Sequence, residues 1–226
     1  MRICNLILWD IRFQIKYGFY FLYTVLTVLY LAVILSLPTA WRQTVATVLI
    51  FSDPAAMGLF FMGAIVLLEK SQRVPCAFAV SPVKTAEYVM SKLLSLSVIS
   101  LVVAAILAAA TGEERMGLVL LGTFCSGVIF TLFGVIVATR IESLNQFILW
   151  TVPVEILGFV PALLHLAGIL PEWFRFYPAN ICMDMVAGKM PAAAQVGILV
   201  ILIAVLWYFS CESVRKMWNC LGGMKL

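Results

Sequence analysis

The chain has 226 residues, of which 64% are hydrophobic, and its mean hydropathy is +1.08. Ordinary soluble domains are only about 45–50% apolar, so this composition excludes most of them. The net charge of +4 on so apolar a chain indicates sidedness in a membrane rather than nucleic-acid binding. We therefore expect an all-α polytopic membrane protein in which residues 1–226 form a single transmembrane domain.

Residues 1–17 are amphipathic with a helical period. The apolar stripe consists of Cys4, Ile7, Leu8, Ile11 and Ile15. Arg12 and Lys16 lie on the opposite face, so the pattern predicts a helix over 2–16 in the membrane interface. Asp10 and Arg12 interrupt the apolar core that a signal peptide needs. The alternative is a first membrane span that simply begins earlier, with a charged flank.

Six apolar stretches are long enough to cross a bilayer, because about 20 helical residues cover roughly 30 Å of hydrocarbon. They are residues 18–37, 45–68, 92–110, 117–139, 146–169 and 192–211. If the N-terminus is cytoplasmic, eleven Lys and Arg residues fall inside and four fall outside. The outer four are Arg42, Arg115, Arg175 and Lys189. This asymmetry predicts that both termini are cytoplasmic.

The second stretch contains an acid and a proline, Asp53 and Pro54. A carboxylate inside a membrane is costly unless it faces water, a polar partner or the bundle interior. One interpretation is architectural, with Asp53 capping a helix that restarts at Pro54 near the outer interface. The other interpretation is a side chain that faces the substrate.

Residues 69–91 form the longest predicted cytoplasmic loop. Ser81 and Pro82 are typical of the N-cap and first position of a helix that continues into the third span. Before them, Val74–Val80 is largely apolar yet too short to cross a membrane. Such a stretch is expected to be covered by a partner or to lie in the interface. A simple interfacial re-entry is the alternative.

The fifth span contains Pro153 and Pro161, which predict a kinked or broken helix. It also contains Glu155, a second acid inside the membrane, and His165, which we expect to be a hydrogen-bonded interface residue rather than a ligand. Residues 170–191 are predicted to be an outer re-entrant segment of one or two short helices. Its aromatic anchors are Trp173, Phe174, Phe176 and Tyr177. Residues 212–226 are predicted to be a cytoplasmic tail.

Motifs for catalysis are absent from the sequence. There is no G-x-x-x-x-G-K-[ST] nucleotide-binding loop, no H-E-x-x-H, no G-x-S-x-G and no paired metal ligands. We therefore expect no catalytic residues, no metal site and no cofactor bound by this chain.

Taken with this organisation, two stretches resemble a known family. They are IFSDPAAMGLFFMGAIVLLEKSQR, from residue 50 to 73, and SPVKTAEYVMSKLL, from residue 81 to 94. The chain resembles an ABC-2 type transporter permease, in particular the small drug (fluoroquinolone-type) export permeases. The resemblance covers essentially the whole chain. The chain departs from many members in carrying neither a larger extracellular domain nor a fused nucleotide-binding domain.

The resemblance implies the membrane subunit of an exporter in the bacterial plasma membrane, without its own ATPase site. A separate ABC ATPase, present in two copies, would bind ATP and Mg and dock on a coupling helix within residues 71–88. The coupling residues would be Arg73, Val74, Phe78, Ser81, Pro82, Lys84, Glu87 and Tyr88, with Arg12 and Lys16 of the interfacial helix beside the ATPase.

A second permease chain, identical or different, would meet this one through spans one, two and five. The candidate substrate path along that contact consists of Phe51, Asp53, Phe60, Phe61, Glu155 and Phe159. Aromatic rings with an occasional acid suit hydrophobic or amphipathic molecules, which are often cationic. For each phenylalanine taken singly, packing or lipid contact is the alternative.

Two other classes of function remain open from the sequence. One is a gradient-driven secondary transporter in which Asp53 and Glu155 carry protons. The other is a membrane protein that does not transport, either an assembly scaffold or an enzyme acting on lipids.

Overall fold

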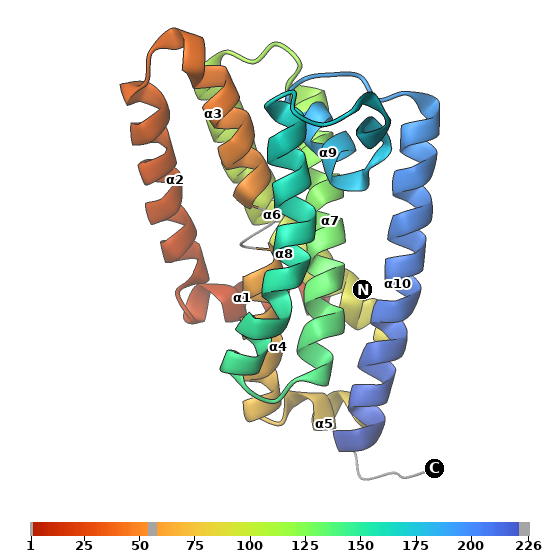
Figure 1. The fold of residues 1–226 in the computed structure, drawn as a ribbon. Helices are drawn as coiled ribbons and strands as arrows, with labels where there is room; N and C mark the ends of the chain where they lie inside the picture. The colour runs from red at the N-terminus through yellow and green to blue at the C-terminus, as the bar shows by residue number, and fades with distance from the viewer. Residues whose placement is uncertain (1, 54–57, 222–226) are drawn as a thin grey trace.

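The computed structural model describes residues 2–53 and 58–221, and within these ranges the chain is helical and contains no strand. Figure 1 shows a bundle with its long helices roughly side by side. The helices are α1 (Arg2–Lys16), α2 (Phe19–Ser36), α3 (Thr39–Ser52), α4 (Leu59–Ser71), α5 (Val74–Ala79), α6 (Thr85–Thr111), α7 (Met116–Arg140), α8 (Leu144–Leu166), η2 (Glu172–Phe176), α9 (Pro178–Val186) and α10 (Ala193–Leu221).

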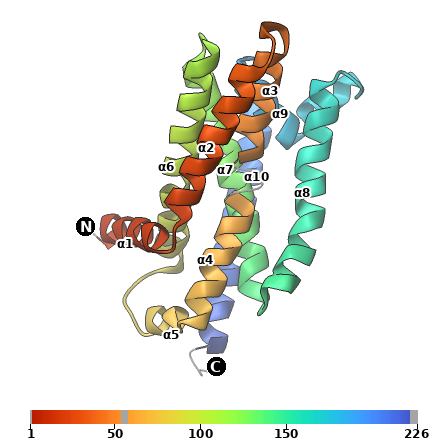
Figure 2. The ribbon, with the colours of Figure 1, turned by 90° about the vertical axis from the view of Figure 1, so that its left-hand side faces the viewer.

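The core lies around α6 and α7. In their most apolar stretches 56% and 67% of the residues are buried, against 17% in both α2 and α8. Figures 1 and 2 show the other long helices arranged around this pair. The exposed residues of α2 and α8 are largely apolar, as expected for helices that face lipid or another membrane protein.

Five helices of the described chain are long and apolar enough to cross a membrane: α2, α6, α7, α8 and α10. The predicted second span, 45–68, falls on α3 and α4, which have 14 and 13 residues and are each too short to cross alone. In Figure 2 they lie end to end, with α3 in the upper half and α4 in the lower half. Asp53 was predicted to cap a helix that restarts at Pro54, and Pro54 lies outside the described residues. The next helix, α4, begins at Leu59.

Two helices lie across the bundle in its lower half, with α5 at the lower end, where α10 also ends, and α1 above it (Figures 1 and 2). The sharp turn from α1 into α2 passes through Gly18, whose φ of 77° is costly for residues with a side chain. A similar turn between α4 and α5 uses Arg73, with φ 57°.

One predicted helix boundary is wrong. Ser81 and Pro82 do not begin a helix: α6 starts at Thr85, because Glu87 accepts a hydrogen bond from the backbone N–H of Lys84 (2.9 Å) and closes the first turn. Of the two alternatives for the fifth span, a kinked or a broken helix, the break is wrong, since α8 is one helix across both prolines. The part of the predicted tail up to Leu221 is helical and continues α10.

Candidate functional site: a buried polar network and an apolar cavity

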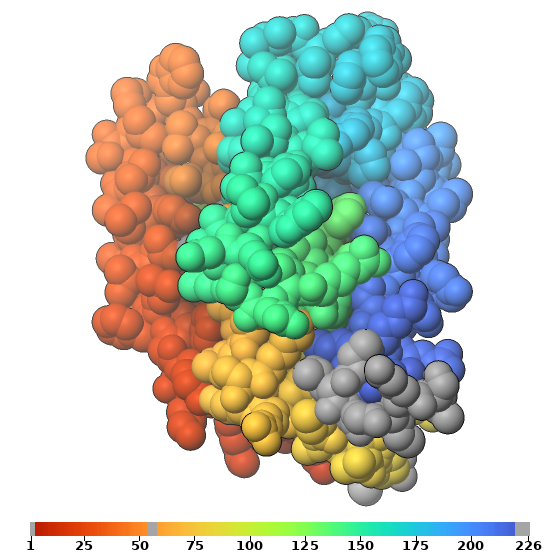
Figure 3. Space-filling model, turned by 60° about the horizontal axis from the view of Figure 1, so that its bottom comes forward, coloured from red at the N-terminus to blue at the C-terminus, as the bar shows by residue number. Residues whose placement is uncertain are grey.

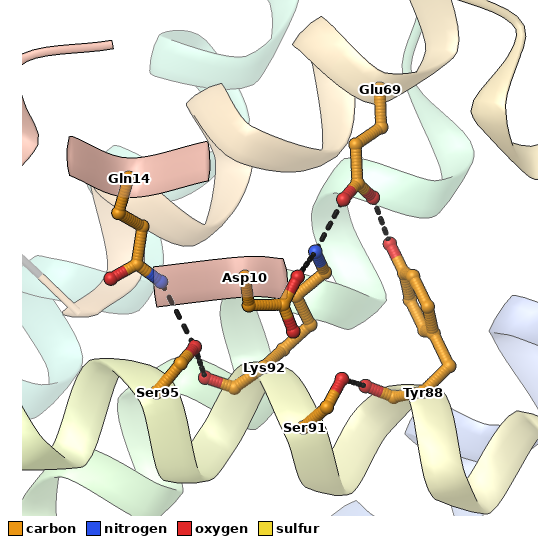
Figure 4. A network of polar contacts seen from close by, with 7 residues as sticks. All are labelled: Asp10, Gln14, Glu69, Tyr88, Ser91, Lys92 and Ser95. Atoms are coloured by element: carbon orange, nitrogen blue, oxygen red, sulfur yellow. Dashed lines mark hydrogen bonds and ion pairs between the residues drawn. The ribbon is translucent and has the colours of Figure 1, made fainter. Parts of the chain in front are cut away.

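The lower end of the bundle contains a buried polar network centred on Lys92 of α6 (Figure 4). Its ammonium group forms ion pairs with Asp10 of α1, at 2.5 Å, and with Glu69 of α4. The other oxygen of Glu69 accepts a hydrogen bond from the hydroxyl of Tyr88, at 2.6 Å. These four residues, which we call the Lys92 network, are at most 3% exposed.

The Lys92 network holds three helices together. A charge moved out of water is costly unless it is paired and hydrogen-bonded, and Lys92 meets this requirement with two carboxylates and the faces of the Trp9 and Tyr88 rings. Beside it, Gln14 of α1 donates a hydrogen bond to Ser95 of α6 at 2.9 Å. Helix α1 is thus joined to the core by polar contacts.

The sequence interpretation missed this network. In α1 it assigned the apolar stripe and the basic face, whereas the residues that face the core are Asp10, Phe13 and Gln14. Arg12 and Lys16 are exposed, as are Leu8 and Ile15. The sequence did contain a signal for it: an acid, Asp10, on an otherwise basic helix, together with Glu69 at the end of span two and Lys92 at the start of span three.

The predicted coupling residues divide into two groups. Tyr88 is buried in the network, and Phe78 of α5 packs against it with ring centroids 5.5 Å apart. Phe78 also stacks on Trp218 of α10 at 5.8 Å, so α5 is attached to both α6 and α10. The Tyr88 side chain is therefore out of reach of a partner protein.

The second group faces outward. Arg73, Pro82 and Lys84 are exposed, and Val74, Ser81 and Glu87 are partly so. Between them, Val80 is 84% exposed, the highest value among the exposed large hydrophobic side chains. Val80 thus presents an apolar side chain directly after α5, the helix whose Phe78 packs against Tyr88 of the Lys92 network.

The upper half of the bundle contains an apolar cavity of about 270 Å³. It is lined by Phe51, Ser126, Ile129, Phe130, Phe133, Val154, Leu157, Gly158, Tyr177, Pro178, Ala179, Cys182 and Leu202. The hydroxyls of Ser126 and Tyr177 donate to backbone carbonyls, so towards a guest they can act only as hydrogen-bond acceptors. The cavity fits the apolar part of a small molecule.

The predicted substrate-path aromatics are only partly brought together. Phe51 lines the cavity and stacks on Phe159 of α8, with centroids 6.1 Å apart. Phe61 instead packs edge-on against Phe19 and Tyr23 of α2, at 4.9 and 5.0 Å. Phe60 lies 6.3 Å from the ring of Phe147, away from the cavity. For Phe60 and Phe61 the structure favours packing.

Neither of the two membrane acids lines the cavity. Asp53 is 2% exposed, and neither of its carboxylate oxygens has a hydrogen-bond partner among the described residues. Glu155 is half-buried on α8, and it forms no ion pair with the described part of the chain.

The outer segment stabilises α8 where its prolines weaken it. Pro161 has no N–H, so the carbonyl of Leu157 lacks its usual helical donor. The hydroxyl of Tyr177 donates to that carbonyl at 2.8 Å and so supplies the missing donor. His165 near the end of α8 bonds to Asp184 of α9 at 2.9 Å, as expected of a hydrogen-bonded histidine. Tyr177 therefore links the segment before α9 to α8.

The family model of the fluoroquinolones export permease proteins matches residues 1–214. The chain belongs to this family. It is thus a multi-pass membrane protein of a permease family, as the resemblance in its sequence had predicted.

Two curated relatives are the fluoroquinolones export permease proteins of Mycobacterium tuberculosis strains CDC 1551 and H37Rv. Each is 31% identical to this chain over 150 residues, which cover 64% of this chain and 62% of the relative. The matched region thus spans less than two thirds of those proteins.

Proposed function

We propose that this chain is the membrane subunit of an ATP-binding cassette exporter that moves hydrophobic or amphipathic small molecules out of the bacterial cell. The family match over residues 1–214 carries this proposal, and the names of the relatives suggest drug-like cargo. A partner ATPase, in two copies, supplies the ATP and Mg site that the sequence of this chain lacks. A second permease chain completes the transporter.

The proposed topology has six crossings, with α3 and α4 together making the second. Both termini are then cytoplasmic in the bacterial plasma membrane. The excess of Lys and Arg in the segments assigned to the cytoplasm supports this orientation, as does the position of α1 and the end of α10 in the same half of the bundle (Figure 1).

The docking of an ATPase on α5 can be tested at Val80. A buried charge without a partner costs several kcal/mol, so Val80→Asp is expected to reduce the ATPase that copurifies from native membranes at least tenfold and to abolish efflux. Met190→Asp is the matched control, because Met190 is 76% exposed but lies at the outer end. Equal loss in both variants, or unchanged ATPase with Val80→Asp, contradicts docking on α5.

The cavity can be tested as part of the cargo path with Ala179→Leu. The larger side chain occupies space between α7, α8 and α9 without removing a hydrogen bond, so efflux of a bulky drug is expected to fall several-fold while the protein remains folded. Efflux measured in cells, normalised to the amount of protein in the membrane, gives the result. Unchanged efflux places the path outside this cavity.

A gradient-driven transporter is the second candidate, favoured by the unpartnered carboxylate of Asp53. It predicts that the purified chain transports alone when a proton gradient is imposed, and that Asp53→Asn abolishes this transport. An exporter that needs its ATPase transports nothing under these conditions.

A further inference from the structure

Two neighbouring hollows at the lower end of the bundle share one cation, Arg140. The first is a polar cleft of about 570 Å³ between α4, the α7–α8 connection and α10. Its charged lining residues are Lys70, Arg140, Glu142 and Lys216. Figure 3 shows these three parts of the chain meeting on the lower face.

The second hollow is a mainly apolar groove of about 360 Å³ on the surface formed by the end of α7 and the beginning of α8. It is lined by Ile136, Val137, Arg140, Ile141 and Trp150. Trp150 is 64% exposed, and a tryptophan in this position is typical of the headgroup level of a membrane. A polar cleft with cations therefore continues into an apolar groove that faces lipid.

The cations of the cleft are not equally available. The Lys70 ammonium donates to the carbonyls of Ala138, Thr139 and Ile141, at 2.7 to 3.0 Å, and so caps the end of α7. Arg140 is exposed and forms no ion pair or hydrogen bond with the described residues. Lys216 has only a loose pair with Glu212, at 3.7 Å. Arg140 and Lys216 can thus bind an anion.

We propose that this pair of hollows binds one anionic phospholipid, with its phosphate between Arg140 and Lys216 and an acyl chain along the groove beside Trp150. The charge of the cleft favours an anion, since three cations line it against the single carboxylate of Glu142. Basic pockets between membrane helices at the cytoplasmic side commonly bind such headgroups. The apolar groove favours a lipid over free phosphate, because phosphate has no apolar part that could fill the groove. This site lies apart from the proposed cargo cavity.

The test uses the full chain in neutral detergent and phosphatidylglycerol as the probe, with bound lipid counted by native mass spectrometry and affinity measured by titration. One phosphatidylglycerol per chain is expected, with clear preference over phosphatidylcholine. Arg140→Gln and Lys216→Gln are each expected to weaken binding about fivefold, because a cation near the surface contributes on the order of a factor of five. Glu142→Gln is expected to strengthen binding.

Arg215→Gln is the matched control, because Arg215 is exposed next to Lys216 on α10 but does not line the cleft. Its affinity is expected to equal that of the unaltered protein. The proposal is wrong if Arg215→Gln weakens binding as much as Arg140→Gln, if phosphatidylcholine binds equally well, or if inorganic phosphate displaces the lipid at millimolar concentration. Variants that still elute as a single folded species are compared. Because lipid binding is measured without transport, these results leave the exporter proposal untouched.

Discussion

Replacing Lys92 with methionine is expected to destabilise the folded protein by about 3–5 kcal/mol, because it leaves the carboxylates of Asp10 and Glu69 buried without a counter-charge. Methionine has nearly the same length, so the change removes charge and hydrogen bonds with little loss of packing. Thermal melting in detergent, followed by size-exclusion chromatography, measures the effect. The exposed Lys84 provides the control, and Lys84→Met should melt like the unaltered protein.

A combined variant separates charge from packing at this site. Removing all the charges, with Lys92→Met, Asp10→Asn and Glu69→Gln together, is expected to restore most of the lost stability, because no unpaired charge remains buried. If Lys92→Met alone is as stable as Lys84→Met, the network does not hold α1 and α4 to α6. If the combined variant is no more stable than Lys92→Met, the loss of stability comes from changed packing and not from unpaired charge.

Replacing Gly122 with leucine is expected to separate α9 from α7 and to lower stability by about 3 kcal/mol. A Cβ at this position would lie 2.8 Å from the Cβ of Met185 and 2.9 Å from the backbone nitrogen of Val186. Backbone atoms cannot turn aside as a flexible side chain can, so the helices must move apart. Small residues at such crossings let membrane helices approach closely.

Gly117 is the matched control for this substitution. It lies on the same helix, five residues earlier, and an added Cβ there meets no atom within 4 Å. Gly117→Leu is therefore expected to be neutral or slightly stabilising, since leucine has the higher helix propensity. Equal melting temperatures for the two variants would show that α9 does not depend on close contact with α7.

Much of the helical organisation could be predicted from hydropathy alone. The predicted first span, 18–37, differs from α2 by one residue at each end, and the predicted fourth, 117–139, differs from α7 by one residue at each end. Such agreement is expected because an apolar stretch of this length has few other stable conformations in a membrane. The error at Ser81 falls at a polar helix end, where a side-chain hydrogen bond decides where the helix begins.

The candidate site was less accessible to sequence reasoning. Phe51 and Phe61 look alike as aromatic residues in an apolar stretch, yet one lines the cavity and the other packs on α2. Periodicity places both on helices but does not say which neighbour each side faces, because in a membrane almost every face is apolar.

The sequence by itself determined that this is a multi-pass helical membrane protein of a permease family, because hydrocarbon admits little else from so apolar a chain and because its motifs are local. Only the tertiary structure decided that Asp10, Glu69, Tyr88 and Lys92 form one network, from positions as far as 82 residues apart. It also showed that Tyr177 replaces the donor that Pro161 lacks. Both contacts depend on how helices pack, and a buried polar group takes as partner whichever side chain that packing brings within reach.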